Sequence, residues 1–168
     1  LPSSSHLFYA NELFPPAPRY RTRNPNYFIG DFSRFDFSFD AGCCIEVIEH
    51  LTPAMVKKLF CDLAKKSRQN SIYIFNTGLS DYIKQEDIEY LDPLRRGHII
   101  GWSIKSLQHL VESIGFQILP IPGKKWAFIA EYQATHSFDS LEDRIWKALP
   151  ENVNILRDAK TGQLMYVL

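Results

Sequence analysis

The stretch FDAGCCIEVIEHL, residues 39–51, decides the fold of this chain. From residue 41 it is almost continuously apolar, which suits a β-strand covered on both faces, as strands of a parallel sheet are. Two carboxylates and an imidazole, Glu46, Glu49 and His50, then follow where that strand should end. Ligands of open α/β sheets bind beyond the carboxyl ends of the strands. The stretch therefore predicts both a strand and a site.

The segments that follow alternate between helix and strand. Thr52 and Pro53 are typical of a helix start, as N-cap and first helical residue, and an apolar stripe comes after them. The run SIYIFNTG, residues 71–78, predicts a second buried strand. Ser103 then caps a second amphipathic helix, which Gly115 should end.

The next two apolar runs, FQILPI and WAFIAEY, flank the sequence PGKK. This arrangement predicts a β-hairpin with its turn at residues 122–125. Strands that alternate with helices are typical of a parallel sheet, and such sheets often carry an antiparallel edge strand. The fold class predicted is α/β: a doubly wound, mostly parallel sheet with a C-terminal antiparallel hairpin.

Two short apolar runs precede the opening stretch. One ends in Asn11 and Glu12, and the other, NYFIGD, is stopped by Gly30 and Asp31. Polar side chains thus follow each of four predicted strands, and we expect them to line one crevice. The strand-end residues are Glu12, Asp31, Glu46 and Asn76 with Thr77.

Composition limits the classes of function. The 168 residues include 19 Lys and Arg and 19 Asp and Glu, so the formal net charge is zero and nucleic acid is an unlikely partner. Apolar residues make up 45%, which excludes disorder, and no run is long enough to span a bilayer. The sequence predicts a cytoplasmic protein with no membrane partner. The three cysteines, an odd number, are expected to be small buried apolar residues.

The blocks FIGDF, FSFDAGCCIEVIEHLTP, SIYIFNTG and RRGHIIGWSIKSLQHLVESIGFQILPI occur in that order. This series, over roughly residues 7–132, resembles the second half of class I S-adenosylmethionine-dependent methyltransferases. The resemblance implies a Rossmann-like methyltransferase domain over residues 1–133 and S-adenosyl-L-methionine as the cofactor. Residues 134–168 would be an extension made of a helix, SLEDRIWKAL, and a terminal hairpin.

The resemblance also implies roles for the strand-end residues. Glu12 would accept hydrogen bonds from the cofactor's ribose hydroxyls, and Asp31 with Phe32 would lie at the adenine. The exit of the next strand would border the methionine part and the methyl group, through Cys44, Ile45 and Glu46. Asn76 and Thr77 would face the methyl acceptor.

One feature of that family is missing. Its first strand is followed by a glycine-rich GxGxG turn, where the backbone approaches the cofactor, and this chain contains no GxG. Two interpretations stay open: the chain is truncated at the N-terminus and lacks the first βα unit, or it is a degenerate domain. Loss of that unit would expose apolar surface on residues 41–47, unless a second copy or a partner chain covers it.

Three functions are compatible with these residues. The first is S-adenosylmethionine-dependent methyl transfer to a small-molecule, sugar or lipid acceptor. A base is needed only if the acceptor must lose a proton, and the candidates are His50, His98 and Glu46. Another of the three is a non-catalytic methyltransferase-like interaction module, which the missing glycine turn favours.

The remaining function is metal-dependent methyl transfer. Small-RNA 3′-terminal 2′-O-methyltransferases carry an E-x-x-E-H block and a later histidine that together hold a divalent cation. The pattern is similar here, and it would make Glu46, Glu49, His50 and His98 ligands of Mg²⁺ or Mn²⁺. Arg95 and Arg96 would then meet phosphate.

Overall fold

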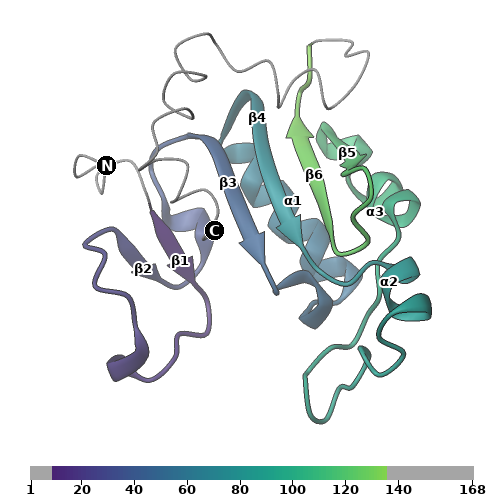
Figure 1. Cartoon of the computed structure of the whole chain (residues 1–168). Helices are drawn as coiled ribbons and strands as arrows, with labels where there is room; N and C mark the ends of the chain where they lie inside the picture. The colour runs from purple at the N-terminus through teal and green to yellow at the C-terminus, as the bar shows by residue number, and fades with distance from the viewer. Residues whose placement is uncertain (1–8, 136–168) are drawn as a thin grey trace, which may run out of the picture. The chain divides into compact units, whose positions relative to one another are not determined.

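The structure is a computed structural model that describes residues 9–135 (Figure 1). Its larger sheet has the strand order β3-β4-β6-β5. β3 and β4 are parallel, whereas β6 runs antiparallel to both β4 and β5. The strands are β3 (Phe39–Ile45), β4 (Ser67–Asn76), β5 (Phe116–Pro120) and β6 (Ala127–Tyr132). The predicted parallel neighbours and the C-terminal hairpin are therefore confirmed.

A second sheet is formed by the two short N-terminal runs. β1 (Ala10–Glu12) and β2 (Tyr27–Ile29) pair in parallel, with Glu12 opposite Ile29. The 3₁₀ helix η3 (Phe32–Arg34) follows β2. Between the two strands the proline-rich segment forms only a short 3₁₀ helix, η2 (Pro18–Tyr20), because proline disrupts longer helices.

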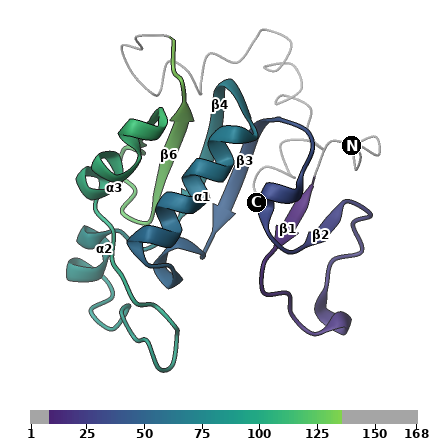
Figure 2. The ribbon, with the colours of Figure 1, turned by 180° about the vertical axis from the view of Figure 1, so that it is seen from behind.

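Two helices cover one face of the larger sheet (Figure 2). They are α1 (Pro53–Lys65) and α3 (Ile104–Val111), the latter continued by the 3₁₀ helix η5 (Glu112–Ile114). α1 buries the ring of Phe60, which stacks on Phe75 of β4 at a centroid distance of 5.1 Å. Phe75 stacks in turn on Phe128 of β6 at 4.9 Å. The core thus lies between these helices and the middle of the sheet.

The predicted helix boundaries are confirmed. Thr52 caps α1, its hydroxyl accepting a hydrogen bond from the backbone N–H of Met55. Ser103 caps α3 in a reciprocal capping box with Ser106. The helical segment ends at Gly115, whose φ of 97° lies in the left-handed region that glycine tolerates.

The expectation that β3 is covered on both faces is wrong. Within residues 9–135 it pairs with β4 alone, and most of its residues are exposed. Ile45, for example, keeps 54% of its surface accessible. Cys43 is exposed too, so the expected burial of all three cysteines is also wrong. The reason is that no described strand lies along the free edge of β3.

The remainder of the chain lies beyond the described range. The chain divides into two units between Thr135 and His136. The predicted helix SLEDRIWKAL and the terminal hairpin fall outside the described residues, and the 1–133 and 134–168 division stays a prediction. In the described part, the helices are too short or too polar to cross a bilayer.

Candidate functional site

The exit of β3 makes a strained turn. Glu46 has a positive φ of 51°, a region that a residue with a Cβ rarely adopts, and its N–H donates to the carbonyl of Asn76 across the sheet. A 3₁₀ helix, η4 (Ile48–His50), follows and buries Ile48 and Glu49. Trp102 Nε1 fixes this turn by donating to the carbonyl of Ile48 at 3.0 Å. The strand end is therefore held in one conformation from two sides.

Glu49 is fully buried, which is rare for a carboxylate. Its backbone carbonyl accepts hydrogen bonds from Ile99 and Ile100, so it anchors the loop that carries His98. A protonated Glu46 can donate a hydrogen bond to the side chain of Glu49. When Glu46 is ionised, neither side-chain oxygen of Glu49 receives a hydrogen bond from the described residues. A buried carboxylate in this state is energetically unfavourable unless a cation or a proton lies beside it.

His50 and His98 lie next to Glu49, and each ring is held by one backbone carbonyl. Each Nδ1 contacts a backbone carbonyl: His50 that of Gly97 at 3.0 Å, and His98 that of Tyr90 at 2.9 Å. A carbonyl only accepts, so each Nδ1 carries the hydrogen, and in the neutral ring the lone pair is on Nε2. Carbonyls orient metal-ligating histidines in the same way.

Three side chains converge here. One ligand atom from each of Glu49, His50 and His98 lies within 4.8 Å of the other two. The imidazole rings are 4.9 Å apart, and His50 Nε2 lies 4.0 Å from Glu49 Oε1. Glu49 and His50 are neighbours in η4, and the fold brings His98 to them from a distant loop, so three of the four residues predicted as alternative metal ligands lie together.

The fourth residue, Glu46, has a perturbed acidity. Burial, and then the hydrogen bond and negative charge of the neighbouring Glu49, raise the pKa of Glu46 to about 7. Cys44, on the same strand, differs chemically: burial above all, and then the charge of Glu49, raise the pKa of its thiol to about 12. Cys44 is therefore a packing residue with no thiolate character at neutral pH.

A polar cleft of about 460 Å³ opens beside this cluster. Three predicted residues line it: Glu46 at the end of β3, Asn76 at the end of β4, and His98. Thr77, in contrast, is buried. Arg96, predicted to meet phosphate, lines it too, and the cleft residues that the sequence analysis missed are Gly78, Tyr82, Glu86, Asp87, Tyr90 and Trp126. Most of them lie on the loop after β4, where no periodic pattern marks which side chains turn inward.

The two arginines predicted to meet phosphate are paired within the protein. Arg96 lies 2.7 Å from Asp87, and Arg95 lies 3.2 Å from Asp92. Both guanidinium groups are thus engaged by carboxylates of their own loop. The structure therefore gives no support to a phosphate site made of these arginines.

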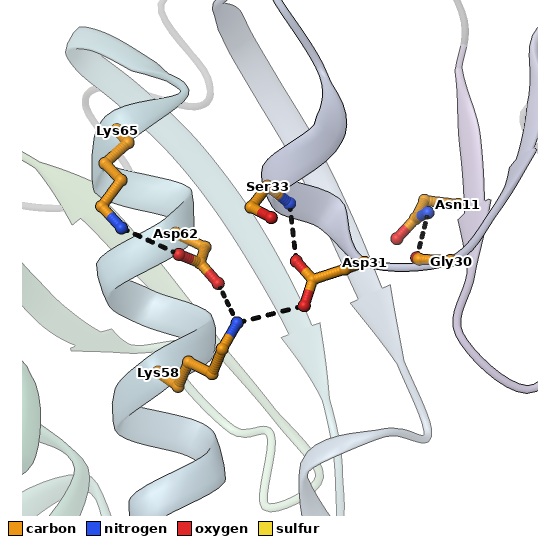
Figure 3. A network of polar contacts seen from close by, with 7 residues as sticks. All are labelled: Asn11, Gly30, Asp31, Ser33, Lys58, Asp62 and Lys65. Carbon is orange, nitrogen blue, oxygen red and sulfur yellow. Dashed lines mark hydrogen bonds and ion pairs between the residues drawn. The ribbon is translucent and has the colours of Figure 1, made fainter.

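The residues assigned to the cofactor's ribose and adenine lie at the other sheet and do not line this cleft. Glu12 is exposed at the end of β1, where its carboxylate accepts from the N–H of Phe14. Asp31 follows β2 and caps η3 through Ser33, as Figure 3 shows. Phe32 is partly buried against the core. The two predicted halves of the site are therefore carried by separate elements.

Comparisons with known proteins identify the fold. Neither a scan of protein-family models nor a search of curated proteins gives a match. Among solved structures, the dimethyltransferase RosA of Streptomyces davawensis, which methylates 8-amino-8-demethyl-D-riboflavin, superposes with a TM-score of 0.53 at 19% identity, over 65% of this chain. An O-methyltransferase family protein of Burkholderia thailandensis gives 0.52 at 7% identity, over 66%.

This chain spans 34% and 36% of the length of these two structures. At such low identity the likeness concerns the fold alone, and it agrees with the mixed α/β sheet described above. The described part of this chain has the class I methyltransferase fold.

Proposed function

We propose that the chain takes part in methyl transfer from S-adenosyl-L-methionine to a small-molecule, sugar or lipid acceptor. The observation that carries this proposal is that Glu46, Asn76 and His98, from three separate segments, line one cleft at the carboxyl ends of β3 and β4. In sheets of this kind ligands bind at that edge. The methyltransferase fold of the neighbours supports the same assignment.

The cofactor supplies a methyl group bonded to a positively charged sulfur. In the transfer, the acceptor atom would bond to the methyl carbon, and the electron pair of the broken carbon–sulfur bond would stay on sulfur. This chain would orient the reactants: Glu12 at the ribose, Asp31 and Phe32 at the adenine, and Cys44 with Ile45 beside the methyl group. Such positioning can supply most of the rate enhancement of a displacement.

Glu46 is the best candidate for the base that removes a proton from the acceptor. With a pKa of about 7, its side chain is partly ionised at neutral pH, which suits a general base. It also lines the cleft. His98 lines the cleft as well, and its Nε2 is the nitrogen left to accept a proton. His50 lies beside it and is the third candidate.

Binding of radiolabelled S-adenosyl-L-methionine, competed by S-adenosylhomocysteine, tests this function. Asp31→Ala should weaken binding about tenfold, whereas Asp36→Ala, a change of an exposed carboxylate in the same segment, should leave it unchanged. Equal losses in both variants would contradict the assignment of Asp31. A folded chain that binds no cofactor would favour the interaction-module hypothesis.

One observation favours a second candidate function, a metal-dependent methyltransferase of the type that acts on RNA 3′ ends. It is the convergence of Glu49, His50 and His98, with buried carboxylate oxygens that lack a donor while Glu46 is ionised. One carboxylate and two imidazoles are a donor set suited to Mn²⁺, which accepts both oxygen and nitrogen ligands. The cation would neutralise Glu49 and orient the hydroxyl groups of the acceptor.

Thermal unfolding with Mn²⁺ separates the two candidates. A metal site predicts a rise in Tm with Mn²⁺ that Glu49→Gln abolishes, because a ligand that binds only the folded state stabilises it. Glu86→Gln, a change of a cleft carboxylate outside the cluster, serves as the control. No rise in Tm would contradict the metal-dependent function, and a metal-dependent preference for RNA with a free 3′-terminal ribose would establish its acceptor.

A further inference from the structure

Lys58 connects helix α1 to the end of β2, as Figure 3 shows. Its ammonium lies 2.5 Å from Asp62 Oδ2, one turn further along the helix, and 3.2 Å from Asp31 Oδ2. Lys65 holds the other oxygen of Asp62 at 3.1 Å. The carboxylate of Asp62 is almost buried, so it fixes the Lys58 ammonium against the helix.

Asp31 is consequently held at both of its oxygens. Oδ1 accepts a hydrogen bond from the N–H of Ser33 at 2.8 Å, and Oδ2 accepts one from Lys58. The bonds from Ser33, and then that from Lys58, lower the pKa of Asp31 to about 2, so the carboxylate is ionised at neutral pH. Each oxygen has two acceptor sites, so a further donor can still bind.

Stability alone is a weak reason for this contact. The side chains of Lys58 and Asp31 are 62% and 43% exposed, and ion pairs between such groups contribute little to folding. The contact does, however, add a second restraint on the rotation of the carboxylate, at the oxygen that Ser33 does not bind. Fixing a ligand-binding group in its bound orientation increases affinity because less motion is lost on binding.

We propose that Lys58 is a positioning residue, which orients the Asp31 carboxylate to accept a hydrogen bond from the exocyclic amine of the cofactor's adenine. The inference rests on the proposed function, in which Asp31 lies at the adenine. Lys58 acts through Asp31 and does not itself touch the cofactor. The ammonium is a fixed part of the site because the almost buried carboxylate of Asp62 holds it in place.

The test compares two ligands on four forms of the 168-residue chain by isothermal titration. S-adenosylhomocysteine has the exocyclic amine, whereas S-inosylhomocysteine has a carbonyl oxygen at that position, and this atom cannot donate a hydrogen bond to Asp31. The forms are the unchanged chain, Lys58→Met, Lys58→Arg and Lys65→Met. Lys65→Met is the matched control because Lys65 binds the same Asp62 carboxylate but has no described contact with Asp31.

Lys58→Met should lower the affinity for S-adenosylhomocysteine about five- to tenfold and leave the affinity for S-inosylhomocysteine unchanged. Lys58→Arg should restore most of the affinity, and Lys65→Met should change neither ligand. An equal loss for both ligands, no loss, or tighter binding by Lys58→Met would overturn the inference and leave the proposed function standing. If the folded, unchanged chain binds neither ligand, the proposed function fails and the inference fails with it.

Discussion

Glu46 and Glu49 are two carboxyl groups at one strand end whose chemistry depends on what lies beside them. Glu49 is buried next to two imidazoles, whereas Glu46 faces the cleft with a pKa raised to about 7 by burial and by Glu49. Two neighbouring carboxyl groups resist ionising together. A proton on Glu46, or a cation at Glu49, therefore relieves the same repulsion.

This repulsion predicts how stability depends on pH. The folded-state pKa of Glu46, about 7, exceeds the ordinary value of 4.5, so the folded protein binds this proton more tightly than the unfolded chain. The contribution of Glu46 is therefore most favourable below pH 4.5, is lost as the pH rises to 7, and is constant above 7. Glu46→Gln mimics the protonated form and should remove this dependence.

Urea unfolding from pH 4.5 to 8, in the presence of a chelator, measures the effect. Glu46→Gln should match the unchanged protein at pH 4.5 and exceed it at pH 8 by about 1 kcal/mol, a value reduced for the solvent screening of a partly exposed group. Glu12→Gln, at an exposed carboxylate on the other sheet, is the control. Parallel pH profiles for Glu46→Gln and the unchanged protein would contradict the raised pKa.

Residues whose roles depend on distant parts of the chain were beyond the sequence analysis. The family resemblance predicts that Asp31 contacts the cofactor. In the structure Asp31 also caps the start of η3, a local role that its position after Gly30 suits. Its partner Lys58 gave no signal, because an exposed lysine on a helix is the most common arrangement. Trp126 is 43% exposed and lines the cleft, and no local pattern in the sequence marks it as a site residue.

The helices were the elements most fully predicted from sequence. Thr52 and Ser103 cap them, and Gly115 ends the second, because these residues act through bonds to their immediate neighbours. The burial of β3 was not predicted correctly, since it depends on which strand lies along its free edge. The apolar run alone predicts a covered strand, whereas the absence of a GxG turn predicts that residues 41–47 lose cover, and the exposure of β3 agrees with the second prediction.

Loss of the α1 cap should lower stability by a known amount. Thr52→Ala removes the hydroxyl that accepts from Met55 N–H, and the free energy of unfolding should fall by about 1 kcal/mol. Thr52→Ser keeps the hydroxyl and should lose much less. Denaturant unfolding of the three proteins checks this, and equal stability of the Ala variant and the unchanged protein would show that the cap does not matter.

At the scale of the whole molecule, the free edge of β3 is the most exposed apolar feature of the described sheet. Ile45 on this strand is 54% exposed, and Ile74 on the adjacent strand β4, where it pairs with Cys43, is 45% exposed. Strand edges of this kind tend to pair with another chain. We therefore expect the chain to associate, either with a second copy or with a partner chain that supplies a strand.

Light scattering after size-exclusion chromatography tests the first alternative. The unchanged chain should elute as a dimer or larger species at tens of micromolar concentration, and Ile45→Lys should shift it toward the monomer. Ile88→Lys, a change at a loop residue that is 86% exposed, should leave the elution unchanged. A monomer at every concentration would contradict self-association and direct attention to a partner chain.

The central claim is that this chain binds the methyl-donor cofactor, although it contains no glycine-rich turn. The most direct measurement is isothermal titration of the folded chain with S-adenosylhomocysteine, with and without Mn²⁺. The account predicts micromolar binding, which Mn²⁺ strengthens if the Glu49, His50 and His98 cluster holds a cation. Absence of binding under both conditions, by a chain shown to be folded, would contradict it.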